Sequence, residues 1–200
     1  MNKNRHKIKL SYNSPVILSF TILAFIVTIV GIATGGTATS LLFSTYRSSL
    51  LNPLYYVRLF THILGHAGLS HYFGNFMYIL LIGPMLEEKY GSKKLLYMIL
   101  FTAGITGIIN SIFFPNVMLC GASGIVFMLI LLSSFAGAKE KEGIPLTVIL
   151  VAVLYLGNEI LNGIFSNDDI SQLAHLIGGA CGGIFGYLLR PKKTNSYTSY

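Results

Sequence analysis

The chain has 200 residues, of which 53% are hydrophobic and only 10% are charged, and its mean hydropathy is +0.66. Soluble domains carry roughly 25% charged residues, so this composition argues against a soluble enzyme and favours a polytopic membrane protein. The net charge is +7, but no basic stripe interleaves with aromatic residues, which argues against a nucleic-acid partner. Cys120 and Cys181 have no metal-ligand spacing and are expected to be free thiols.

The chain contains six apolar runs that approach the roughly 20 residues needed to cross a membrane. In chain order they are Pro15 to Ala33, His71 to Leu86, Lys94 to Phe114, Gly121 to Ala138, Ile144 to Ile164 and Ile170 to Leu189. We therefore predict an all-α membrane protein with a core at 15–189, a basic tail at 1–14 and a polar tail at 190–200. The stretch from Gly35 to Ser70 is too apolar for a linker and is expected to form short helices at the membrane surface.

The basic residues predict the orientation of these runs. Twelve of the 14 lysines and arginines lie in the two tails or in the gaps after the second and fourth runs, and only Arg47 and Arg58 lie elsewhere. Because positive loops face the cytoplasm, both termini are predicted to be cytoplasmic, in a plasma-membrane protein with six spans. A cleaved signal peptide is the alternative for the first run, but that run is longer than a typical signal core.

Polar residues stand at the starts of three apolar runs, where they are costly unless they have a function. His71 and Asn75 open the second run, Ser123 opens the fourth, and His175 lies in the first turns of the sixth. All three runs enter the membrane from the outer side in the predicted orientation. These residues therefore share one depth, which predicts a single polar cavity in the outer leaflet.

The residue types in this cavity suit nucleophilic catalysis. A serine becomes a nucleophile near pH 7 when an imidazole within hydrogen-bond reach accepts its proton, which suggests Ser123 and His175. Ser123 stands between Gly121-Ala122 and Gly124 at a predicted helix start, where free backbone N–H groups stabilise an oxyanion. His71 and Asn75 are four residues apart and share one helix face. No acidic residue stands out as a third member, because Asp168 and Asp169 are expected in a loop.

The sixth run carries a row of small residues. Gly178, Gly182 and Gly186 recur every fourth residue, and Ala174 extends the row. Such a row lets two membrane helices pack closely, which a dyad divided between the fourth and sixth runs requires. The row is equally consistent with simple bundle packing or with a dimer contact.

Together these residues resemble the rhomboid family of intramembrane proteases. Its pattern is His-x-x-x-Asn on the second helix, Gly-x-Ser-Gly on the fourth, and Ala-His followed by spaced glycines on the sixth, and the resemblance covers Pro15 to Leu189. The resemblance implies a six-transmembrane-helix rhomboid bundle with an external membrane-surface loop between helices 1 and 2. It also implies a serine endopeptidase that cleaves transmembrane proteins near the outer membrane face, without a metal or other cofactor.

The resemblance also assigns roles to individual residues. It implies Ser123 as nucleophile, His175 as general base, and an oxyanion hole built from the His71 and Asn75 side chains with the backbone N–H groups of Ser123 and Ala122. Two positions depart from the family pattern. Val57-Arg58 replaces a frequent Trp-Arg pair. Phe127 replaces a tyrosine that some relatives have beneath the histidine; a phenylalanine can still stack on the imidazole, but it offers no hydroxyl to orient the ring.

Three other interpretations remain open. The first is a catalytically weak rhomboid-like protein that binds membrane clients, although the chain keeps both Ser123 and His175. The second is a transporter or channel. Such proteins usually carry ionisable residues along the whole membrane depth, whereas here these residues gather at one depth. The third is a zinc site at His62, His66 and His71, which lacks an HExxH motif and a carboxylate ligand. We predict no metal, and the expected partners are transmembrane substrates and the lipid bilayer.

Overall fold

The computed structural model describes residues 11–136, 143–156 and 169–189, and these residues form helices joined by short loops. The elements are α1 (Pro15–Ala33), α2 (Thr37–Leu42), α3 (Pro53–Thr61), α4 (Leu69–Tyr90), α5 (Ser92–Phe113), α6 (Ser123–Ser134), α7 (Leu146–Val151), the π-helix η1 (Ala152–Leu156) and α9 (Asp169–Leu188). No strand occurs among the described residues, and the one bridge there is an isolated pairing of Thr45 with Leu119. The prediction of an all-helical protein is therefore confirmed.

The helices lie where the apolar runs predict them, but several ends differ. α4 extends beyond the run from His71 to Leu86 at both ends, and α6 ends at Ser134, before the predicted Ala138. Two helix starts also need correction. α6 begins at Ser123 and not at Gly121, because Gly121 has a φ of +124° and its N–H donates to the His62 carbonyl. α9 begins at Asp169, so this residue opens a helix and does not belong to the preceding loop. The fifth run is helical through Leu156, and its remainder, with Asn158, Glu159 and Asn162, lies outside the described residues.

Among the residues that the structure describes, two helices are long and apolar enough to cross a membrane. These are α1, with a mean hydropathy of 2.7, and α5, with 1.8, while α6 is apolar but shorter. α4 has 22 residues but is less apolar, because it carries His71 and Asn75 in its first turns and Glu87, Glu88 and Lys89 in its last turn. The count of six spans thus stays a prediction, as does the placement of α2 and α3 at the membrane surface.

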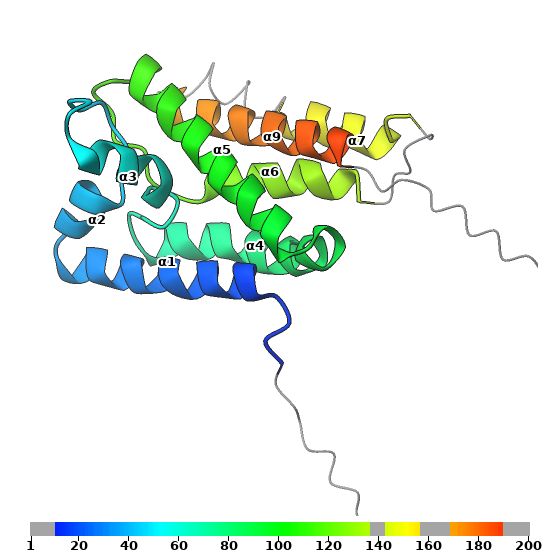
Figure 1. The fold of residues 1–200 in the computed structure, drawn as a ribbon, viewed down its shortest axis with the longest axis horizontal. Helices are drawn as coiled ribbons and strands as arrows, with labels where there is room; N and C mark the ends of the chain where they lie inside the picture. The colour runs from blue at the N-terminus through cyan, green and yellow to red at the C-terminus, as the bar shows by residue number, and fades with distance from the viewer. Residues whose placement is uncertain (1–10, 137–142, 157–168, 190–200) are drawn as a thin grey trace, which may run out of the picture.

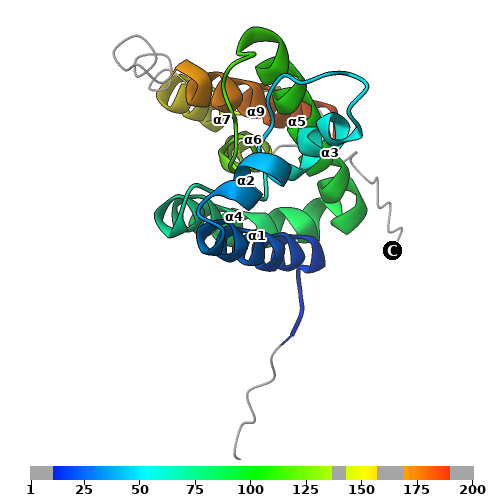
Figure 2. The same cartoon turned by 90° about the vertical axis from the view of Figure 1, so that its left-hand side faces the viewer.

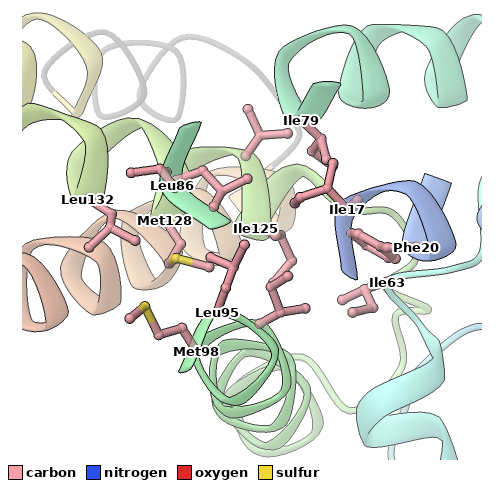
Figure 3. Close-up of a cluster of buried hydrophobic side chains, with 14 of the residues drawn as sticks. Ile17, Phe20, Ile63, Ile79, Leu86, Leu95, Met98, Ile125, Met128 and Leu132 are labelled. Atoms are coloured by element: carbon pink, nitrogen blue, oxygen red, sulfur yellow. The ribbon is translucent and has the colours of Figure 1, made fainter. Parts of the chain in front are cut away.

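The helix α6 lies at the centre of the bundle. Figure 2 shows it end-on, with α1 and α4 on one side and α7 and α9 on the other. Every residue from Gly124 to Leu132 is buried, as expected for a helix that is apolar all round and enclosed by its neighbours. Figure 3 shows Ile125, Met128 and Leu132 meeting side chains from the helices around them. The first residues of α6 are therefore held by a packed core.

A buried carboxylate joins the start of α1 to the end of α4. The backbone N–H groups of Val16 and Ile17 each donate to Glu87 at 3.0 Å, and the Ser92 hydroxyl donates to Glu87 at 2.8 Å. The first N–H groups of a helix have no partner within the helix, and a carboxylate there also suits the helix dipole. Glu87, although 3% exposed, is therefore stabilised by the helix that it caps.

We expect Glu87→Gln to lower the free energy of unfolding by about 1–2 kcal/mol, because hydrogen bonds to a charged group contribute roughly 1.5–3 kcal/mol and the amide keeps one acceptor. Thermal unfolding in detergent measures the difference. The matched control is Glu88→Gln, because Glu88 is exposed on the next position of the same helix. Equal losses in the two variants would contradict the capping role.

Candidate active site

The chain turns sharply into α6 at Gly121. The preceding loop is held by paired hydrogen bonds between the backbones of Thr45 and Leu119, each 2.9 Å, and the Gly121 N–H donates to the His62 carbonyl at 2.9 Å. Ser123 is then the first helical residue. It is partly exposed, whereas Ala122 and Gly124 on either side are buried. Ser123 therefore lies at the N-terminal end of the central helix, where its side chain is partly accessible.

The first turns of α4 place two nitrogen-bearing side chains against this turn. A β-carbon at Gly121 would lie 2.8 Å from His71 Nε2 and 3.7 Å from Asn75 Nδ2. A residue other than glycine would therefore clash there, apart from the strain of its positive φ. Asn75 Nδ2 is buried and has no hydrogen-bond partner in the part of the chain that the structure describes. A buried donor without an acceptor is costly in a native fold, so it points to a function.

The helix α9 brings His175 to the same end of the bundle. The His175 imidazole stacks on the Phe127 ring, with ring centroids 4.4 Å apart and planes 11° apart, so the expected stacking is confirmed. His175 also lies within electrostatic range of His71. Side chains from α4, α6 and α9 therefore meet near the start of α6, although they are far apart in the sequence.

Close backbone packing between α6 and α9 makes this meeting possible. A β-carbon at Gly178 would overlap the Gly124 carbonyl oxygen, and one at Gly182 would overlap the backbone of Met128. These two helices share the most extensive contact among the described elements. The glycine row therefore serves packing inside the bundle, and His175 lies one turn before Gly178 on the same face.

His66 holds the turn before α6 through a hydrogen bond to its backbone. Its Nε2 accepts a hydrogen bond from the Ala122 N–H at 3.4 Å, and its Nδ1 lies 3.1 Å from the Leu64 carbonyl oxygen, to which it donates in that tautomer. Burial, and secondly repulsion from a charged His71, lowers the pKa of His66 to about 4. The imidazole is thus neutral near pH 7 and able to accept. The Ala122 N–H, expected from the sequence as an oxyanion donor, is already paired.

His62 is buried beneath the same loop. Its Nδ1 lies 3.2 Å from the Arg58 carbonyl oxygen, and its Nε2 lies 3.4 Å from the Thr106 hydroxyl. Burial lowers the pKa of His62 to about 4. Its nitrogens are therefore engaged in hydrogen bonds that hold the loop. Among the described residues, no group of three or more His, Cys, Asp or Glu side chains has the arrangement of a metal site.

The low pKa values of His62 and His66 predict a loss of stability in acid. An imidazole titrates near 6.5 in the unfolded chain and near 4 in the folded protein, so the unfolded chain binds more protons between these values. Stability should therefore fall as the pH drops from about 6.5 towards 4, by at most roughly 1.4 kcal/mol per pH unit for each histidine. Thermal unfolding of the parent and of His62→Asn measures this dependence. An equally steep dependence in both proteins would contradict the assignment to His62.

Two supporting contacts escaped the sequence analysis. His66 lies five residues before His71, as in the rhomboid pattern, and the sequence predicts that it hydrogen-bonds within the external segment, but it does not indicate the Ala122 N–H as its partner. The loop before α6 is also held by Asn110, whose Nδ2 donates to the Thr45 and Val117 carbonyls at 3.2 Å each. Nothing in the sequence around Asn110 indicates these distant partners.

The fold and the site define a helical membrane protein that gathers a serine, two histidines and an asparagine at one end of its bundle. The chain belongs to the rhomboid family, since the family model described as the Rhomboid domain matches residues 53–192.

Curated relatives extend this result. The chain is 31% identical over 142 residues to Rhomboid-related protein 1 of Caenorhabditis elegans, which covers 66% of this chain and 39% of that protein. It is 30% identical over 174 residues to Rhomboid protease GluP of Bacillus subtilis, covering 84% of this chain and 32% of GluP. YdcA of the same bacterium is 31% identical over 150 residues, covering 70% of each chain. The chain thus spans well under half the length of the first two relatives.

Proposed function

We propose that this chain is an intramembrane serine endopeptidase that hydrolyses peptide bonds of transmembrane proteins near the outer membrane face. The family membership and the relative named as a rhomboid protease support a protease. The observation that carries the proposal is the buried, unpaired Asn75 Nδ2 beside Gly121. A buried amide nitrogen that lies beside this turn without an acceptor suits a donor to the oxyanion.

In the proposed mechanism, Ser123 Oγ attacks the carbonyl carbon of the scissile peptide bond while His175 accepts the hydroxyl proton. The oxyanion of the tetrahedral intermediate accepts hydrogen bonds from Asn75 Nδ2, from His71 and from the Ser123 backbone N–H. His175 then donates its proton to the leaving amine, and a water molecule hydrolyses the acyl-enzyme with His175 again as base. No step requires a metal or another cofactor.

In this mechanism Phe127, and not an acidic side chain, orients the His175 imidazole. Stacking of the Phe127 and His175 rings fixes the plane of the imidazole. The ring offers no acceptor for the second imidazole nitrogen, so it orients His175 by packing alone. Gly121, Gly124, Gly178 and Gly182 support the site by allowing the close approach of α4, α6 and α9.

The membrane placement is part of the proposal. We infer six spans in the plasma membrane, both termini in the cytoplasm, and the site in the outer leaflet, as the distribution of lysine and arginine predicts. The substrate helix would enter laterally between α4 and α7 and unwind near the cut, because a helical peptide carbonyl is already bonded within its own helix.

Purified protein tests this proposal directly. We expect it to cleave a fluorogenic transmembrane peptide and to be labelled at Ser123 by a fluorophosphonate. Labelling without cleavage would indicate an unmatched substrate sequence. A folded protein that neither cleaves nor is labelled would overturn the protease and favour a rhomboid-like protein that binds membrane clients.

We expect Asn75→Ala to lower kcat by roughly 10²–10³-fold, which is the cost of removing one oxyanion-hole donor. Its free energy of unfolding should stay unchanged or rise, because the variant removes a buried donor that has no partner in the described structure. The matched control is Asn110→Ala, which removes two hydrogen bonds to loop carbonyls and should lower stability. A destabilised Asn75→Ala with normal kcat would assign Asn75 to structure and not to catalysis.

A further inference from the structure

An apolar cavity is lined by none of the residues proposed for catalysis or for the oxyanion hole. It has a volume of about 550 Å³ and lies between the first halves of α1 and α5. Figure 1 shows α5 crossing the bundle at an angle to α1. Ten of the thirteen residues that line the cavity are apolar, and the only polar groups on the other three side chains are hydroxyls. Pockets that bind small ligands have volumes of roughly 300–1,000 Å³, so the space admits an extended hydrocarbon chain.

The cavity has two different ends. Pro15 and Ser92, the first residues of α1 and α5, line one end, and Ile63 and Leu64, in the segment after α3, line the cavity farther from these helix starts. From Ser92 to Leu100 the cavity follows eight residues of α5, or about 12 Å at 1.5 Å per residue. One leaflet of the hydrocarbon core is about 15 Å thick, half of the roughly 30 Å total. The length of the cavity therefore matches a single leaflet.

The charges at the open end favour an anionic headgroup. Lys93 and Lys94 are exposed directly after Ser92. The buried carboxylate of Glu87 is turned to the Val16 and Ile17 N–H groups and to the Ser92 hydroxyl, so its charge is satisfied by hydrogen bonds. In the orientation proposed above, this end lies at the cytoplasmic surface, where the membrane carries its anionic lipids.

We propose that this cavity binds one anionic phospholipid of the cytoplasmic leaflet, with an acyl chain between α1 and α5 and its phosphate at Lys93 and Lys94. The inference rests on the proposed membrane placement and does not require protease activity. The acyl chain would contact the apolar side chains of Phe20, Leu23 and Leu100, which line the cavity.

Tryptophan fluorescence tests the site, because the natural chain contains no tryptophan. The reporter is Leu100→Trp, inside the cavity. The matched control is Ile22→Trp, which lies about as far from the start of α1 as Leu100 lies from the start of α5. Ile22 is outside the cavity, and both side chains are exposed. Each purified variant in detergent is titrated with phosphatidylglycerol or phosphatidylcholine brominated near the middle of the acyl chain, since bromine quenches nearby tryptophan. Leu96→Trp, which also lines the cavity, replaces Leu100→Trp if the latter does not fold.

We expect quenching of the cavity reporter to saturate at a several-fold lower phosphatidylglycerol content than quenching of Ile22→Trp. Phosphatidylcholine should bind at least about five-fold more weakly there, because each lysine near the surface contributes roughly that factor. Lys93→Gln with Lys94→Gln should remove this preference. Equal titrations at both reporters, or equal binding of both lipids, would overturn the lipid site. Saturable quenching in a protein that neither cleaves the peptide nor is labelled by the fluorophosphonate would instead overturn the protease and leave the lipid site intact.

Discussion

The Ser123→Ala variant is expected to cleave a fluorogenic transmembrane peptide roughly 10⁶-fold more slowly than the parent, which is the loss seen when a catalytic serine or histidine is removed. His175→Ala should lose activity to the same extent, because the nucleophile and its base act as one unit. For the same reason the double variant should be no slower than either single variant. Initial rates in detergent and in reconstituted vesicles measure all three.

A matched control exists on the same helix. Ser133 lies near the other end of α6, where its hydroxyl donates to the Ile130 carbonyl at 2.7 Å. Ser133→Ala should leave the cleavage rate and the fluorophosphonate labelling unchanged. If Ser123→Ala kept more than a small fraction of the parent rate, the nucleophile would have to lie elsewhere, and the proposed dyad would be wrong.

The second large effect is expected from a single methyl group at Gly178. A β-carbon there would overlap the Gly124 carbonyl oxygen and lie 2.8 Å from the Gly124 carbonyl carbon. The obstructing atoms belong to the backbone and cannot rotate away, so α9 must shift relative to α6. His175 lies one turn earlier on α9 and would move with it. Because a misplacement of about 1 Å can cost roughly 10²-fold in rate, Gly178→Ala should lose about that much activity.

The same substitution should also lower stability, by about 1–3 kcal/mol, since overpacking a well-packed contact costs roughly this amount. The matched control is Gly183→Ala, because a β-carbon at Gly183 meets no atom within 4 Å. That variant should keep its activity and gain up to about 1 kcal/mol, because alanine is the better helix former. Equal behaviour of Gly178→Ala and Gly183→Ala would show that the contact between α6 and α9 does not position His175.

The sequence by itself determined which segments are helical and which polar residues to examine. Long apolar runs have few alternatives to helices in a membrane, because every backbone N–H and C=O must be satisfied within the segment. For this reason the first run matches α1 at both ends. The spacing of His71 and Asn75 follows from helix geometry alone and needs no knowledge of neighbouring helices.

Only the tertiary structure decided how these residues are held. The pairing of the Ala122 N–H with His66, the bridge between Thr45 and Leu119, and the Glu87 cap on α1 each join residues far apart in the sequence. Periodicity and composition report which face of a segment is apolar, but they do not report which distant atom comes within 3 Å of it. The orientation of α4 and α9 against α6, and with it the unpaired Asn75 amide beside Gly121, is set by side-chain and backbone packing.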